Sequence, residues 1–261
     1  MLATESPTIE TSALMIDPAN KAGHSPIDPQ RETVLRNLLD GPTRGERLNY
    51  ESAINLGLVD MFYYDPKTGY DGLVHTLSGE LLKGDEGAQV PANPQGFHHE
   101  PSGTFGPEEA PSFVDREHLK SKTSKQKSNY TERPYEPYQA KVSIAGLKKM
   151  TLETNPTTNE TELAEVRNNM FPKEYDALTV LQAIRIAKQG RDKSKDTLAE
   201  NGKLVNEGYA PMIDAKSVMK IRLVMDPVDE KIIVAYPKVK FRGIMKLSAT
   251  ALEHFEQVGD I

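Results

Sequence analysis

The clearest chemical signal in this 261-residue chain is a concentration of histidines in one turn-rich stretch. Four of the six histidines lie between residues 72 and 137, namely His75, His98, His99 and His118. The ordinary pKa of histidine is near neutrality, so two such rings can hold opposite protonation states and serve as a general acid and a general base. Such a pair suits transphosphorylation of RNA, in which one ring takes the proton of a ribose 2′-OH and the other protonates the departing 5′-oxygen. A nearby cation would stabilise the charge on the phosphoryl oxygens.

Other chemistries fit these residues less well. The chain has no cysteine, which excludes disulfides, thiolate metal sites and a cysteine nucleophile. The segment His98-His99-Glu100 lacks the i, i+4 histidine spacing of a helical zinc site, so we expect no metal and no cofactor. A surface role remains the alternative for any single histidine, because loop histidines are more often solvated than catalytic.

The distribution of charge is more informative than the net charge of −6. Residues 1–115 are acidic, with 7 Lys and Arg against 18 Asp and Glu, whereas residues 116–149 carry nine basic side chains against three acidic ones. Residues 216–246 are again basic, eight against three. Two basic segments on an acidic chain could form a groove that follows phosphates, and two solvated faces are the equally simple alternative.

The N-terminal quarter divides into two predicted segments. Residues 1–30 are polar and lack sustained periodicity, which indicates a flexible leader. Residues 31–68 contain two short helical patterns separated by turn residues, and the second pattern stops at Gly57. This segment resembles half of a plakin-type repeat, although a single copy cannot build a repeat array. The start also lacks the charged and apolar regions of a secretory signal, and no apolar run is long enough to cross a membrane.

Regular structure is predicted from Tyr138 onward. Apolar and polar residues alternate over residues 138–144, which is typical of a half-buried strand. Residues 153–165 are polar and predict a loop, and the helical spacing that follows Phe171-Pro172 predicts a helix closed by Gly190. Residues 216–240 predict a hairpin with its turn at residues 226–229. The order of elements indicates an α+β fold with small antiparallel sheets and packed helices.

Several motifs, taken together in this order, resemble bacterial EndoU-type endoribonucleases, which occur as nuclease domains of polymorphic and contact-dependent toxins. The resemblance covers about residues 70–240, within a nuclease domain that we place at residues 69–261. The matching motifs are His75-Thr-Leu-Ser-Gly79, Gly96-Phe-His-His-Glu-Pro-Ser-Gly103, Tyr138-Gln-Ala-Lys-Val142, Met170-Phe-Pro172 and Ile232-Ile-Val-Ala-Tyr-Pro237.

The resemblance implies roles for individual residues. His75 and His98 would be the catalytic pair, in an order that the sequence leaves open, and Tyr236 would seat the base or the ribose. The family's lysine has no clear counterpart, so Lys149 and Arg167 are both candidates for the catalytic cation. The candidate substrate-binding residues are His99, Asn168 and Asn169.

Two departures from the family pattern affect base selection. Asn168 and Asn169 stand where hydroxyl side chains are expected, and Val234 stands where a coronavirus relative has threonine. An asparagine amide can pair with a uracil edge through its donor and its acceptor, so uridine preference is retained as an expectation.

The sequence therefore predicts a metal-independent endoribonuclease that cleaves single-stranded RNA and leaves 2′,3′-cyclic phosphate ends. The resemblance further implies a secreted or delivered effector that acts in the cytoplasm of a target cell, with a cognate immunity protein as a partner besides RNA. The alternative prediction is a non-catalytic RNA- or protein-binding module with an EndoU-like fold.

Overall fold

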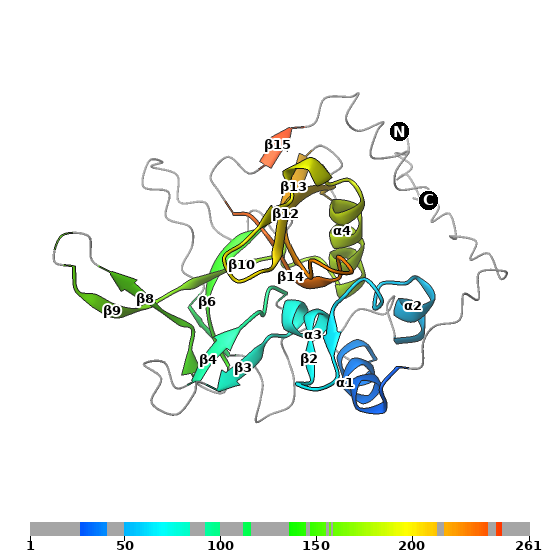
Figure 1. Cartoon of the computed structure of the whole chain (residues 1–261), viewed down its shortest axis with the longest axis horizontal. Coiled ribbons are helices and arrows are strands. Elements are labelled where there is room, and N and C mark those ends of the chain that lie inside the picture. The colour runs from blue at the N-terminus through cyan, green and yellow to red at the C-terminus, as the bar shows by residue number, and fades with distance from the viewer. Residues whose placement is uncertain are drawn as a thin grey trace, which may run out of the picture.

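The computed structural model shows an α+β protein with several small antiparallel sheets and few helices (Figure 1). It describes residues 27–40, 50–83, 92–99, 112–115, 136–144, 147–154, 157, 159–212, 217–239 and 244–246. The predicted leader therefore lies almost wholly outside the described residues, as does most of the basic segment at residues 116–149.

The largest sheet is antiparallel and has the order β11-β12-β13-β14, with β15 added beside β13. One face of this sheet is covered by α4 (Ala177–Gln189), which begins at the Asp176 cap. Gly208 makes the close approach of α4 possible, because a Cβ there would lie 1.9 Å from the Ala187 carbonyl oxygen. The strands are β11 (Thr197–Leu198), β12 (Leu204–Pro211), β13 (Ser217–Met225), β14 (Ile232–Pro237) and β15 (Ile244–Lys246).

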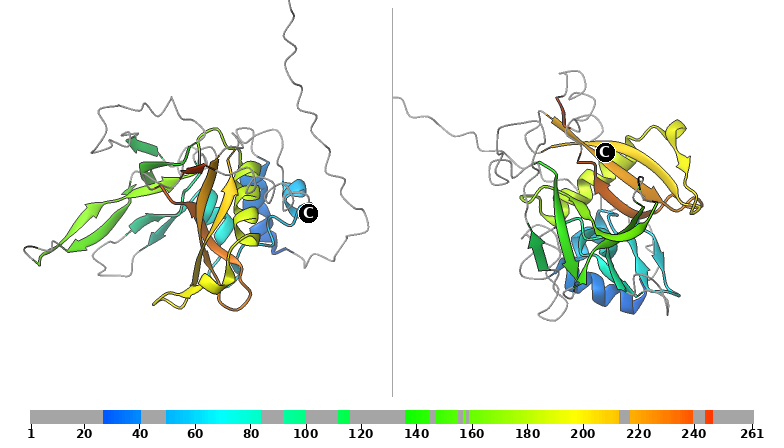
Figure 2. Two further views of the ribbon diagram at one scale, coloured as in Figure 1. Left: turned by 90° about the horizontal axis from the view of Figure 1, so that it is seen from above. Right: turned by 90° about the vertical axis from the view of Figure 1, so that its left-hand side faces the viewer.

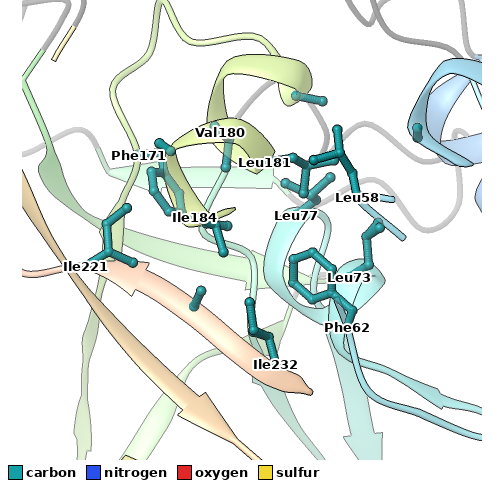
Figure 3. Close-up of a cluster of buried hydrophobic side chains, with 14 of the residues drawn as sticks. Leu58, Phe62, Leu73, Leu77, Phe171, Val180, Leu181, Ile184, Ile221 and Ile232 are labelled. Carbon is teal, nitrogen blue, oxygen red and sulfur yellow. The ribbon is translucent and has the colours of Figure 1, made fainter. Parts of the chain in front are cut away.

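The N-terminal helices belong to the same core as this sheet. Buried side chains of α1 (Pro29–Leu39) and α2 (Tyr50–Asn55) join one apolar cluster with α4, β13 and β14. Figure 3 shows part of this cluster, including Leu181 of α4, Ile221 of β13 and Ile232 of β14. The chain after α2 is also bonded to β14, because the Ile232 amide donates to the Met61 carbonyl oxygen at 2.8 Å. The boundary expected at residue 69 thus does not separate two cores.

A short segment between the N-terminal helices and the second sheet positions the first histidine. It comprises β1 (Tyr64–Asp65), β2 (Tyr70–Asp71) and α3 (Gly72–Leu77). The Asp71 carboxylate caps α3 by accepting from the amides of Leu73 and Val74. The same carboxylate forms an ion pair with Arg31 of α1, whose Nε donates to it at 2.7 Å, and both side chains are almost fully buried. This ion pair ties the N-terminal helix to the helix that carries His75.

The remaining strands form small sheets on the other side of α3 (Figures 1 and 2). A second core of Phe97, Tyr138, Ala140, Val142 and Met170 lies there, and the β8–β9 hairpin projects away from the body of the molecule. Two of these sheets have two strands each: β3 (Glu80–Lys83) pairs with β4 (Ala92–Gln95), and β8 (Met150–Thr154) pairs with β9 (Thr161–Glu165). The third sheet has four strands, β5 (Ser112–Asp115), β6 (Tyr138–Ile144), β7 (Leu147–Lys148) and β10 (Arg167–Met170).

The predicted helices in the N-terminal segment, the strand at 138–144, the helix closed by Gly190 and the hairpin in 216–240 are confirmed. The loop predicted at residues 153–165 is wrong, because most of it belongs to the β8–β9 hairpin. The turn-rich stretch after residue 72 is also more regular than expected, since it begins with α3 and continues into the β3–β4 pair.

Candidate active site

His75 lies in α3 with one ring nitrogen held by a carboxylate. Its Nδ1 is 2.6 Å from Oε1 of Glu80, the first residue of β3. Because an ionised carboxylate only accepts, Nδ1 carries the hydrogen, and Nε2 is the nitrogen that Glu80 does not contact. The ring of Tyr70 packs at 5.4 Å from the His75 ring and covers another side of it. Glu80 and Tyr70 thus fix the orientation of the His75 ring and keep a proton on Nδ1.

The segment before His98 runs against α3 through a sharp backbone turn. Gly96 and Phe97 both have positive φ values, 65° and 59°. The Phe97 amide donates to the His75 carbonyl oxygen at 2.9 Å, and the His98 amide donates to that of Thr76 at the same distance. A Cβ at Gly96 would lie 1.9 Å from the His75 carbonyl oxygen, so only glycine fits. These backbone contacts bring the two histidines together.

The His98 ring is buried and oriented from two sides. Its Nδ1 lies 2.7 Å from the Asn169 carbonyl oxygen, so Nδ1 donates and Nε2 has the lone pair. The Tyr236 ring of β14 stacks on it, with ring centroids 5.0 Å apart. Burial lowers the pKa of His98 to about 3, helped by the positive charges of Lys149 and, more weakly, of His75. His98 is therefore neutral near pH 7.

Lys149 provides the positive charge beside His98. It follows β7 directly, and its Nζ donates to Asn168 Oδ1 at 2.7 Å. Burial lowers the pKa of Lys149 to about 8, which leaves the amine mostly protonated near pH 7. Arg167, the other candidate cation, is the exposed residue of β10, whereas its neighbour Asn168 is buried, so the two side chains leave opposite faces of the strand.

Three residues that were expected to bind substrate have structural contacts instead. His99 is 1% exposed and its Nε2 donates to the Tyr175 carbonyl oxygen at 2.7 Å. Asn168 is 2% exposed, and its amide nitrogen donates to the carbonyl oxygens of Gly96 and Phe97 at 2.6 and 3.1 Å. Since Oδ1 also accepts from the lysine, both ends of the amide are engaged within the protein. His99 and Asn168, which were expected to bind substrate, are thus buried and hydrogen-bonded within the protein.

Asn169 acts mainly through its backbone, since its carbonyl oxygen fixes His98 while its side-chain oxygen accepts from Gln139 Nε2 at 2.9 Å. Glu80 was not predicted as part of the site. The available signal was a carboxylate five residues after His75, close enough in sequence to meet it once α3 ends.

The structure thus brings together His75, His98, Tyr236 and Lys149, leaves Arg167 exposed on β10, and buries His99 and Asn168 in structural contacts. The arrangement can accept a proton at His98 Nε2, donate one from a carboxylate-held imidazole and stabilise an anion with an amine. Within the described residues, no three His, Cys, Asp or Glu side chains converge as metal ligands would.

Comparisons with protein-family models, with curated proteins and with solved structures found no match to this chain. Of the helices in the part of the chain that the structure describes, none combines the length and the apolar character needed to cross a membrane.

Proposed function

We propose that this chain is a metal-independent endoribonuclease with an EndoU-like fold, which cleaves single-stranded RNA and leaves 2′,3′-cyclic phosphate ends. The observation that carries the proposal is the meeting of two differently held histidines beside a buried amine. His98 is neutral and offers Nε2, whereas His75 is held through Nδ1 by Glu80. RNA transphosphorylation needs one proton acceptor, one proton donor and one cation.

The neutral state of His98 makes it the base in this proposal and leaves the role of acid to His75. His98, being neutral, takes the proton of the ribose 2′-OH, and the freed oxygen attacks the adjacent phosphorus. His75 gives a proton from Nε2 to the departing 5′-oxygen, for which it enters the reaction as an imidazolium with the Glu80 carboxylate as its counter-charge; one proton is taken up and one released. Lys149 stabilises the negative phosphoryl oxygens. A phosphate bound beside Lys149 also offsets the charge that lowers the pKa of His98, which makes that ring a stronger base when substrate is present.

Tyr236 stacks on His98, the proposed proton acceptor, and offers a ring against which the ribose or the nucleobase of the substrate can pack. Uridine preference is part of the proposal, but the Asn168 amide does not contribute to it because its donors and acceptor are occupied within the protein. Support for a delivered toxin or effector, acting in a target-cell cytoplasm and neutralised by an immunity protein, comes from the sequence resemblance alone.

The direct test is cleavage of a fluorescently labelled single-stranded RNA in the presence of EDTA. We expect products ending in 2′,3′-cyclic phosphate, identified by mass spectrometry, and no cleavage of the same RNA with 2′-O-methyl groups. His75→Ala and His98→Ala should each abolish the products. His24→Ala removes a histidine from the predicted leader and is the control of matched type.

Two outcomes would overturn the proposal. Cleavage that survives the double change of His75 and His98 would show that another group, or a contaminant, does the chemistry. RNA binding without any product after prolonged incubation would replace the enzyme by a non-catalytic RNA-binding module.

A further inference from the structure

The large sheet has a second face, away from α4, that runs directly into the candidate site. Gly208 of β12 faces α4, so its neighbours Glu207 and Tyr209 lie on the opposite face. In the register of the sheet, Glu207 stands opposite Arg222, which in turn stands opposite Tyr236. Residues that are directly opposite share a face. Arg222 is therefore the immediate neighbour of the tyrosine that stacks on His98.

The next row of the same face adds two more cations. Lys220 stands opposite Tyr209 and lies over its ring, at 5.3 Å from the centroid. The Lys238 amide donates to the Lys220 carbonyl oxygen at 2.8 Å, which places Lys238, the residue after β14, beside Lys220 of β13. We call Lys220, Arg222 and Lys238 the basic strip.

The charges of the basic strip are only partly balanced. Glu207 forms ion pairs with Lys220, at 3.1 Å, and with Lys238. One carboxylate thus serves two amines, and Arg222 is left out although it is the residue directly opposite. The Arg222 Nε is buried and has no hydrogen-bond partner among the described residues. Buried polar groups are normally hydrogen-bonded, so the unpartnered nitrogen shows that Nε does not hold the guanidinium in place, and the Arg222 side chain can turn towards an anionic ligand at the neighbouring candidate site.

We propose that the basic strip binds the phosphates of single-stranded RNA next to the scissile one, with Arg222 nearest to the reacting phosphate. The choice of RNA as the anion rests on the proposed function. A guanidinium suits this task because its planar fork matches phosphate oxygens. Cations that follow the backbone beside an aromatic ring are typical of single-strand binding, and here that ring is Tyr236. Glu207 pairs with the two lysines in the free protein, and the phosphates of the substrate compete with it for their charges.

The test measures binding and not cleavage, so that it can be read even if the protein is not a nuclease. The full chain is titrated into a short fluorescein-labelled 2′-O-methyl oligoribonucleotide, which keeps its phosphates but has no 2′-OH. Fluorescence anisotropy is followed over a range of salt concentrations. Arg222→Gln should weaken binding about tenfold at low salt and reduce the slope of log affinity against log salt by about 0.7, the value for one phosphate contact on a single strand.

Arg185→Gln is the matched control, because it removes the same charge from α4, which covers the opposite face of the sheet. It should leave the slope unchanged. Glu207→Gln should have the opposite effect and tighten binding several-fold, since it frees the two lysines. This second variant keeps the test decisive if Arg222→Gln is poorly folded.

The outcomes separate this inference from the proposed function. RNA cleavage by the wild type, with Arg222→Gln and Arg185→Gln equal in affinity and slope, overturns the inference and leaves the nuclease in place. Binding without cleavage, weakened by Arg222→Gln and strengthened by Glu207→Gln, supports the inference and overturns the nuclease. No binding of the oligonucleotide at any salt concentration overturns the inference.

Discussion

The buried ring of His98 predicts that the protein loses stability in mildly acidic solution. Its pKa falls from 6.5 to about 3 on folding, chiefly through burial. Below pH 6.5 the unfolded chain therefore takes up a proton at this ring that the folded chain does not take up until the pH approaches 3. The free energy of unfolding falls by about 1.4 kcal/mol for each pH unit in this window. Two units below the ordinary pKa, the loss is about 3 kcal/mol. Above pH 6.5 both states are neutral and the effect disappears.

Urea unfolding followed by circular dichroism, at pH 7 and near pH 4.5, measures this loss. His98→Asn is the comparison, because an amide can still donate to the Asn169 carbonyl oxygen but does not titrate. We expect the variant to lose about 3 kcal/mol less than the wild type between the two pH values, whatever its stability at pH 7. Lys149→Met should reduce the loss part of the way, since the amine's charge lowers the pKa of the ring. An identical pH dependence in the wild type and His98→Asn would refute the reasoning.

Three further changes test the support of the site. Glu80→Gln should lower RNA cleavage about 10- to 100-fold with little change in Tm, because it weakens the hydrogen bond to His75 Nδ1. A large drop in Tm would mean that Glu80 has a structural role. Gly96→Ala should destabilise the protein by more than about 2 kcal/mol in urea unfolding. Gly202→Ala is the control, because Gly202 has a similar φ but open space around it, and it should cost about 1 kcal/mol. Equal costs would contradict the close contact at Gly96. Asn168→Leu should cost about 2–4 kcal/mol, because it removes three hydrogen bonds of a buried amide. A neutral effect on unfolding would show that these contacts are dispensable.

Periodicity predicted those parts of the fold that have one buried face. Strand β6 and helix α4 are such elements, and their apolar spacing was visible in the sequence. The β8–β9 hairpin was missed because it projects from the body, so its sequence is dominated by threonine and glutamate instead of an apolar alternation. Helix α3 is only six residues long, too short for a helical period to register, and it depends on the cap at Asp71.

The candidate site was predictable to the extent that its chemistry lies in residue type. Histidine chemistry suggested an acid–base pair, and the resemblance to EndoU-type motifs singled out His75, His98 and Tyr236. The choice between Lys149 and Arg167 could not be made from the sequence. It depends on the burial of Asn168, which Lys149 contacts, and on the exposure of Arg167 on the other face of β10. The role of Asn168 was hidden for a similar reason. Its bonds reach carbonyl groups more than seventy residues away, and no local pattern announces contacts of that range.

The buried pair of Arg31 and Asp71 limits how this protein can be divided or recombined. Asp71 caps the helix of His75, and its charge is balanced from the N-terminal helix α1. A fragment that starts at residue 69 would leave that carboxylate buried without its counter-charge and would uncover the apolar side chains that α1 and α2 protect. The N-terminal segment is therefore not an interchangeable module in front of a unit that folds by itself. Chimaeras joined at this point should fail, whereas a junction ahead of Asp28, the cap of α1, preserves the pair.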